Sequence, residues 1–513
     1  MNKEVRVRFA PSPTGGLHIG GMRTVLFNYL FAKKHQGKFI LRIEDTDQNR
    51  LVEGAENYIL DCLEWSGLKP DEGPFTGGPF APYRQSERKD AYKKYADQLV
   101  KSGHAYYAFD TTEELEGMRN RFKTDLNPTP QYNQEIRQKM RNSLTLEPDE
   151  VTRLLAERTP YVVRIRVPAD ETVKFTDMIR GEVAFSTSLV DDKVLLKADG
   201  MPTYHLAVVV DDYLMNITHA FRGEEWLPSA PVHILLWNYL GWQDHMPQWA
   251  HLPLILKPDG HGKLSKRDGQ RLGFPVFAMN WTDPKTGELT EGYKEKGFLP
   301  EAFINMLALL GWNDGTEQEI FSLGELVDKF TIERVHKGGA RFDYEKARWF
   351  NHEWIKKAHP DALLPAVKRV LSQGGIGVDD DAMLVKVIEL VKDRCTLLTD
   401  FQAQASFFFH APESIDIDAV RPKWDDSKKA FFTACSARLS QLKGWTPEAL
   451  ESGFKSLVAE KQMKAGELML PLRIMLVGGK FGPGVFEIAG LIGQAETCRR
   501  IDAFVNRMDQ EAA

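Results

Sequence analysis

One stretch near the start of the chain, VRVRFAPSPTGGLHIGGMR at residues 5–23, constrains the fold more than any other. Val5, Val7 and Phe9 alternate with arginines, which is the period-two pattern of a β-strand with two different faces. Two prolines then prevent the strand from continuing. From Ile19 the apolar residues recur at helical spacing. The stretch therefore predicts a strand, a loop and a helix, the opening of an α/β fold.

The junction between this strand and helix has the composition of an anion-binding site. His18, Gly20 and Gly21 fall where the helix begins. Unpaired backbone N–H groups and the positive end of the helix dipole lie at such a point. Glycines also allow a phosphate or a base to approach the main chain closely. We expect this junction to bind a nucleotide.

The next segments repeat the alternation of strand and helix. Residues 39–43 predict a second strand that ends in an acidic cluster, and residues 53–65 predict a helix. This order is typical of a parallel sheet covered by helices. Residues 71–84 form a loop rich in glycine and proline that is too long for a plain connection, so we interpret it as an edge of the active site.

The middle of the chain is harder to assign. Residues 88–200 combine charged helical patterns with strands near 161–167 and 173–185, which predicts an α+β insertion. The apolar runs 194–196, 206–210 and 215–217 fit a helix or a strand equally well. We expect the sheet to resume there, with an amphipathic helix at 229–240 and a strand at 251–256. Beyond Leu299 the apolar spacing predicts helices to the end.

Composition excludes several classes of protein. The 513 residues carry a formal net charge of −6, with 42% hydrophobic and 27% charged residues, which is ordinary for a globular protein. The four cysteines lie far apart, so neither a disulfide framework nor a zinc knuckle is indicated. No apolar run is long enough for a signal segment or a membrane span. We therefore expect a cytoplasmic protein with no membrane partner.

Common nucleotide motifs are absent from the sequence. Each Gly-Lys pair is followed by Phe or Leu, so there is no Walker A loop, and no G-x-G-x-x-G occurs. What remains is HIGG at 18–21 and KLSKR at 263–267, each next to a predicted strand end. Each motif alone is most often a helix cap or a solvated basic loop, but the two together, in this order and each at a strand end, favour a functional role.

The two motifs resemble the HIGH and KMSKS motifs of class I aminoacyl-tRNA synthetases. PSPTG, RIEDTD, APYRQSER, DGMPTYHLA and RGEEW, in that order, are similar to the bacterial-type glutamyl-tRNA synthetase family as far as about residue 350. The resemblance implies a Rossmann-like catalytic domain split by an α+β insertion and followed by an all-α anticodon-binding region. Its expected boundaries are 1–87 and 201–256 for the catalytic halves, 88–200 for the acceptor-end insertion, 257–340 for the KMSKS loop and stem-contact region, and 341–513 for the anticodon-binding region.

The resemblance also implies the reaction. The family joins L-glutamate to tRNA(Glu) in two steps, first forming glutamyl-adenylate from ATP and then transferring glutamate to the 3′-terminal ribose. ATP with Mg²⁺, L-glutamate and tRNA(Glu) are the expected partners, and a monomer is the expected state. Residues 88–200 contain no cysteine, so the cysteine-built zinc site of some members is not expected, and no metal ligands are predicted.

Site residues are carried over position by position. His18 and Lys266 match the catalytic positions, and the ATP-binding positions are His18, Gly20, Gly21, Lys263, Ser265, Lys266 and Arg267. The positions expected to hold glutamate are Arg8, Ser12, Glu44, Tyr204 and Arg222. A histidine donor and fixed lysines suit the charge that develops on phosphates, while a planar guanidinium suits a carboxylate.

Two positions depart from the expected pattern. Gly21 replaces the second histidine of HIGH, and Val208 stands where the family commonly has an asparagine that contacts glutamate. Valine cannot replace the hydrogen bonds of an amide, which predicts weaker glutamate binding or a substitute donor. Three alternatives remain open: a glutaminyl-tRNA synthetase, a small-molecule nucleotidyltransferase, and a catalytically inactive RNA-binding paralogue. Arg222 and the PSPTG loop favour glutamate over glutamine.

Overall fold

The first predicted strand, β1 (Arg6–Phe9), lies inside a six-stranded sheet of the order β2-β1-β8-β9-β5-β6. The structure is a computed structural model that describes residues 4–125 and 127–512. The other strands are β2 (Lys38–Leu41), β5 (Thr172–Asp177), β6 (Gly181–Ser186), β8 (His219–Gly223) and β9 (Gln248–Leu252). Each neighbouring pair is parallel except β5 and β6, which form an antiparallel hairpin.

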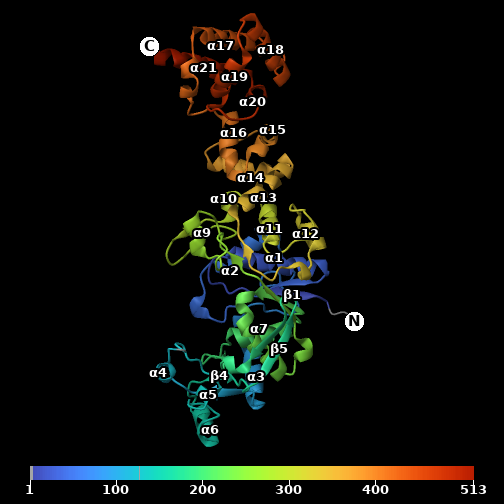
Figure 1. Ribbon diagram of the computed structural model, residues 1–513, viewed down its shortest axis with the longest axis vertical. Coiled ribbons are helices and arrows are strands. Elements are labelled where there is room, and N and C mark those ends of the chain that lie inside the picture. The colour runs from blue at the N-terminus through green and yellow to red at the C-terminus, as the bar shows by residue number, and fades with distance from the viewer. Residues whose placement is uncertain (1–3, 126, 513) are drawn as a thin grey trace. The chain divides into compact units, whose positions relative to one another are not determined.

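The sheet has a switch point between β1 and β8. From β1, helix α1 (Ile19–Lys34) crosses to β2 on one side, whereas β8 pairs on the other side of β1. In open α/β sheets, ligands bind beyond the carboxyl ends of the strands at such a point. The loop after β1 and the residues after β8 lie there; β1 and α1 are labelled in Figure 1.

The helices beside this sheet agree only partly with the predictions. Helix α1 begins at Ile19, as predicted, and α2 (Ala55–Trp65) matches the predicted helix at 53–65. The ambiguous run 206–210 belongs to helix α7 (Tyr204–Leu214), whereas 194–196 is strand β7 (Val194–Leu196). Helix α8 (Ala230–Tyr239) exists, but its residues 230–237 are all buried, so the amphipathic prediction for it was wrong.

The range predicted as the insertion contributes to two sheets. Strands β3 (Ala105–Ala108), β4 (Val162–Ile165) and β7 form a separate antiparallel sheet. Helices α3 (Lys89–Lys101), α4 (Thr112–Phe122), α5 (Gln134–Arg137) and α6 (Pro148–Ala156) lie in the same range. Strands β5 and β6, however, extend the main sheet. The predicted domain boundaries therefore stay a prediction.

The segment after β9 is built of short elements and leads into helices. It contains β10 (Ile255–Leu256), α9 (Lys266–Leu272), β11 (Trp281–Thr282), β12 (Leu289–Thr290), α10 (Tyr293–Lys296), α11 (Pro300–Leu309), α12 (Leu323–Lys329) and β13 (Ala340–Arg341). By contacts between residues, 1–295 and 303–344 form one compact unit, and 296–302 and 345–513 form another.

Among the described residues of the second unit the regular elements are all helices, and its part from residue 345 on runs from yellow to red in Figure 1. Its helices are α13 (Tyr344–Lys357), α14 (Pro360–Gln373), α15 (Asp381–Val391), α16 (Phe401–Phe409), α17 (Asp426–Leu439), α18 (Pro447–Glu460), α19 (Ala465–Val477), α20 (Val485–Ile492) and α21 (Gln494–Ala512). The predicted fold class, a mixed α/β part followed by an all-α part, is confirmed. Within the described residues, no helix is both long and apolar enough to cross a membrane.

Candidate active site

A cavity of about 1050 Å³ opens at the carboxyl ends of β1 and β8, the switch point of the sheet. Its lining brings together residues that lie more than 200 positions apart in the sequence. Of the predicted site residues, those that line it are Arg8, Ser12, His18, Gly20, Gly21, Glu44, Tyr204, Arg222, Lys263, Ser265 and Lys266. Arg267 is exposed and is not among the described residues that line the cavity. Its predicted contact with ATP stays a prediction.

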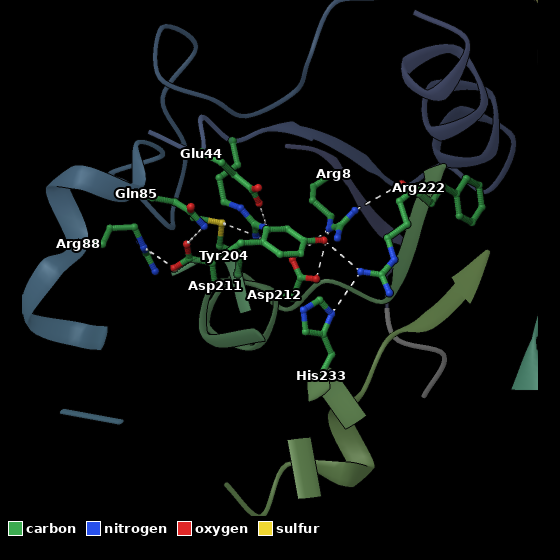
Figure 2. Close-up of polar contacts among 12 residues, drawn as sticks. Arg8, Glu44, Gln85, Arg88, Tyr204, Asp211, Asp212, Arg222 and His233 are labelled. Carbon is green, nitrogen blue, oxygen red and sulfur yellow. Dashed lines mark hydrogen bonds and ion pairs between the residues drawn. The ribbon is translucent and has the colours of Figure 1, made fainter. Parts of the chain in front are cut away.

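One side of the cavity is built on a buried chain of four charges, of which Arg8, Asp212 and Glu44 are labelled in Figure 2. Asp212 accepts hydrogen bonds from Arg8 Nε at 3.0 Å and from Arg42 Nη1 at 2.7 Å. Arg42 in turn donates through Nη2 to Glu44 at 3.3 Å. None of these four side chains is more than 9% exposed. Helix α7 therefore holds Arg8 in place through Asp212, while Arg42 holds Glu44.

Burial and charge act in opposite directions on the two carboxylates of this chain. For Asp212, burial alone would raise the pKa, but Arg8 and Arg42 lower it below the usual value. For Glu44, burial prevails over Arg42 and Arg8, so its pKa is raised. Glu44 is therefore a buried carboxylate whose charge is under-compensated. A ligand ammonium in the cavity would compensate it.

Arg222 has a different environment from Arg8. Its Nε donates to His251 Nε2 at 2.9 Å, and its Nη1 lies 3.1 Å from the Tyr204 hydroxyl, 3.2 Å from Ser229 Oγ and 3.2 Å from His233 Nδ1. Figure 2 shows Tyr204 and His233 beside the guanidinium. Its Nη2 is buried and has no hydrogen-bond partner among the described residues. This guanidinium thus keeps its charge and two N–H bonds for a carboxylate.

The histidine at the start of α1 is a neutral donor. The Gly20 amide donates to His18 Nδ1 at 3.1 Å, so the ring proton lies on Nε2. That Nε2 is buried and finds no partner among the described residues. Burial, with Lys263 and Lys266 nearby, lowers the pKa of His18 to about 4. At neutral pH the ring can therefore donate one hydrogen bond, for example to a phosphate oxygen.

The lysines of the KLSKR loop lie across the cavity from this ring and already have partners. Lys263 Nζ forms an ion pair with Glu225 Oε1 at 2.6 Å, and Lys266 Nζ lies 4.8 Å from the centre of the Phe277 ring. Ser265 caps α9, donating its hydroxyl hydrogen to Asp268 at 2.5 Å. The segment after α9 is joined to the start of α1, because Ile19 N donates to Val276 O at 2.9 Å. The two motifs thus face one cavity.

The structure also explains part of the Gly21 departure. A Cβ atom at position 21 would lie 2.7 Å from Leu17 Cδ1, so any side chain there requires the buried Leu17 to move. At the second departure, Val208 lines the cavity and is 3% exposed. It offers no polar atom to a ligand.

Several supporting residues were missed from the sequence. Asp212, Arg42, His233 and His251 are buried and hold the predicted residues. Arg42 stands in the RIEDTD motif but was given no role there, and the other three lie outside every motif that was recognised. For Asp212 the available signal was the acidic pair at 211–212, which directly follows the apolar run 206–210. Two carboxylates next to such a run need buried partners, because an unpaired buried charge is costly.

The chain is similar to known proteins over nearly its whole length. Residues 4–349 match a family model described as tRNA synthetases class I (E and Q), catalytic domain, and residues 345–505 match an anticodon binding domain. A glutamate–tRNA ligase of Amoebophilus asiaticus is 51% identical over 98% of both chains. That of Christiangramia forsetii is 50% identical over 99% of this chain and all of its own. A crystal structure of a glutamate tRNA ligase from Elizabethkingia meningosepticum in complex with its amino acid matches with a TM-score of 0.93 at 48% identity, covering 99% of this chain and 100% of that one.

Proposed function

Because this chain belongs to the glutamate–tRNA ligase family of class I aminoacyl-tRNA synthetases, we propose that it joins L-glutamate to tRNA(Glu) at the expense of ATP. In the first step the α-carboxylate of glutamate attacks the α-phosphorus of ATP, which forms glutamyl-adenylate and releases pyrophosphate. In the second step a hydroxyl of the 3′-terminal ribose attacks the mixed anhydride, which releases AMP. Neither step needs a side-chain nucleophile, so positioning and charge carry the catalysis.

The observation that carries the choice of amino acid is the state of Arg222. Its four hydrogen-bond partners are neutral groups, and its Nη2 is buried without one among the described residues. A buried cation left in this state favours an anionic ligand over a neutral amide by its charge as well as by its geometry. We assign the side-chain carboxylate of glutamate to Arg222, which favours glutamate over glutamine.

The rest of the substrate fits the neighbouring groups. Glu44, whose pKa is raised by burial, would hold the α-ammonium, and Arg8, fixed by Asp212, would lie beside the α-carboxylate. Ser12 and Tyr204 line the same part of the cavity. In this assignment each charge of the amino acid meets one charge of the opposite sign.

ATP, supplied as its magnesium complex, is assigned to the side of the cavity between HIGG and KLSKR. His18 Nε2 would donate to a phosphate oxygen, and Gly20 and Gly21 would allow the nucleotide to lie near the backbone. Lys263 and Lys266 would exchange Glu225 and Phe277 for the phosphates, where they neutralise the charge that develops. We further propose that the chain acts as a monomer in the cytoplasm.

A charging assay tests the proposal. Purified protein is incubated with ATP, Mg²⁺ and either tRNA(Glu) or tRNA(Gln), with labelled glutamate or labelled glutamine. Glutamate should be esterified to tRNA(Glu), and glutamine should not be. The arm with tRNA(Gln) and glutamate shows how strictly the anticodon is read. Charging with glutamine alone would overturn the choice of amino acid, and the absence of any charging would favour an inactive paralogue.

A further inference from the structure

Arg222 is held by residues at the ends of three adjacent parallel strands. In the pairing of β8 with β9, Arg222 lies directly opposite His251. The next strand, β5, ends at Asp177, which pairs with β9 at Trp249, two residues before His251. The sheet register therefore places the arginine directly opposite the histidine and the aspartate diagonally from it on the other side. All three are buried, with exposures of 7%, 0% and 1%.

Hydrogen bonds join these three side chains in one direction. Arg222 Nε donates to His251 Nε2 at 2.9 Å, so this nitrogen carries no proton. The proton of the neutral ring is then on Nδ1, which lies 2.6 Å from Asp177 Oδ2. Arg222 and Asp177 therefore form no direct ion pair. The neutral ring of His251 lies between the guanidinium and the carboxylate.

Backbone hydrogen bonds to both oxygens hold the Asp177 carboxylate in one orientation. Its Oδ1 accepts hydrogen bonds from the backbone N–H groups of Ile179 at 3.0 Å and Arg180 at 2.9 Å, and its Oδ2 accepts from the His251 backbone at 3.1 Å. His251, together with these bonds, lowers the pKa of Asp177 although burial opposes this effect. The carboxylate is therefore a fixed anion anchored to the turn between β5 and β6, and it fixes the tautomer of the ring.

A second histidine, His233, contacts the Arg222 guanidinium at its Nη1 atom and restricts its orientation. His233 Nδ1 lies 3.2 Å from Arg222 Nη1, and its Nε2 lies 3.2 Å from His205 Nδ1. Because His233 must accept from the arginine, its proton lies on Nε2 and is directed to His205. Burial lowers the pKa of His233 far below its ordinary value, with Arg222 adding to the effect. This ring is therefore also a neutral acceptor.

The pattern differs from that of Arg8 in the same cavity. Arg8 donates directly to the carboxylate of Asp212, which neutralises part of its charge locally. A direct carboxylate on Arg222 would compete with the carboxylate of the substrate for the same guanidinium. A neutral ring fixes the orientation without that competition.

We propose that Asp177 and His251 form a positioning relay that orients Arg222 and leaves its charge for the side-chain carboxylate of glutamate. This inference rests on the proposed function and extends it to two residues that do not line the cavity. Asp177 fixes the ring, the ring fixes the plane of the guanidinium, and Nη2 remains free for the ligand.

Variants at position 251 separate this role from a merely structural one. His251→Leu removes the acceptor for Arg222, whereas His251→Gln can keep both bonds, accepting from Arg222 through its oxygen and donating to Asp177 through its nitrogen. His251→Met fills the space with a flexible apolar chain if the leucine variant does not fold. His219→Leu on the neighbouring strand is the matched control, because His219 contacts Thr218 rather than Arg222.

The measurements are glutamate Kd by calorimetry and the KM values for glutamate, ATP and tRNA(Glu) in the charging assay. His251→Leu should raise Kd and KM for glutamate by about ten- to a hundredfold, the effect of losing a hydrogen bond to a charged group. The KM for ATP should stay near that of the wild type. His251→Gln should restore glutamate KM to within about threefold, because both bonds are kept.

The results that would overturn the proposed relay differ from those that would overturn the proposed function. Unchanged glutamate Kd and KM in both His251→Leu and His251→Met, with wild-type charging intact, would overturn the relay alone. So would an equal rise in the KM values for glutamate and ATP, which indicates general damage. If the wild type binds glutamate in a relay-dependent way but charges no tRNA, the proposed function fails and the relay stands. A wild type that neither binds nor charges glutamate overturns both.

Discussion

Asp212 is the residue whose replacement most severely tests the construction of the amino-acid side of the cavity. It is the shared acceptor of two buried guanidiniums, at 3.0 Å from Arg8 Nε and 2.7 Å from Arg42 Nη1. In Asp212→Asn the side chain keeps its shape but loses its negative charge. Its NH₂ group then faces a guanidinium N–H, which is also a donor. Two buried cations then share a single carboxylate, that of Glu44, whose one side-chain partner in the part of the chain that the structure describes is Arg42 at 3.3 Å.

The expected loss of stability is large. Breaking a buried ion pair by removing one partner costs about 3–5 kcal/mol, because the remaining charge stays buried. The guanidinium of Arg8 also loses its anchor, and one charged hydrogen bond is worth about 1.5–3 kcal/mol, so glutamate KM should rise by about tenfold or more. Since Arg8 and Arg42 lower the pKa of Asp212, its contribution is complete above pH of about 4 and is lost as the pH falls through the folded-state pKa.

Urea unfolding and steady-state charging measure the two effects separately. The matched variant is Asp211→Asn on the same helix, which breaks bonds to Arg88 at 2.7 Å, Gln85 at 2.8 Å and Tyr92 at 2.7 Å. Both variants should lose stability, but only Asp212→Asn should raise glutamate KM. A loss below about 1 kcal/mol, the level of an exposed ion pair, would refute the reasoning for Asp212. So would an equal effect of the two variants on glutamate KM.

Three further predictions concern other parts of the site. Val208→Asn should lower glutamate KM, because it adds an amide to the cavity lining; an unchanged KM would contradict the importance given to this departure. Glu225→Gln should lower the KM for ATP by up to about fivefold, because Lys263 is then free for the phosphates, and a raised KM would show that Glu225 assists binding instead. Burial lowers the pKa of His18 to about 4 and that of His205 to about 3, so the unfolded chain binds more protons below pH 6.5 and the free energy of unfolding should fall from pH 7 to pH 5. His205→Gln should make that pH dependence shallower in urea unfolding, and an unchanged slope would contradict the assignment.

Local patterns predicted local structure well. The end of a strand at two prolines and the start of a helix at Ile19 are fixed by residues within one or two turns, and both were predicted correctly. The run 206–210 was ambiguous because it is apolar throughout and so has no periodicity; it lies in helix α7, where all five residues are buried. Helix α8 is likewise buried almost throughout, although its spacing indicated an exposed face.

Long-range pairing could not be predicted from periodicity. Strands β5 and β6 lie in the predicted insertion range but join the main sheet beside β9. This pairing depends on contacts between segments that are distant in the sequence. The alternation in β1 indicated two faces, yet Arg6 and Arg8 are both buried. Their partners, Glu72 and Asp212, come from other parts of the chain.

The site was predicted to the extent that its residues stand in motifs. HIGG and KLSKR led to one nucleotide site, and the structure brings both to one cavity. The residues behind the motifs were not predicted, because their roles depend on contacts of about 3 Å made across the sheet, as between His251 and Arg222. A sequence motif readily indicates the residues that contact a ligand. It says less about the residues that hold those ligand-contacting side chains in position.

The central claim is that the charge of Arg222 selects glutamate, and the ratio of kcat/KM for glutamate to that for glutamine tests it most directly. This ratio is measured with tRNA(Glu) for the wild type and for Arg222→Gln, which keeps polar donors but removes the charge. We expect the ratio to fall by about a hundredfold or more, in line with the loss of a buried ion pair worth about 3–5 kcal/mol. A ratio that stays the same while both activities fall would contradict the claim and leave Arg222 with a structural role only.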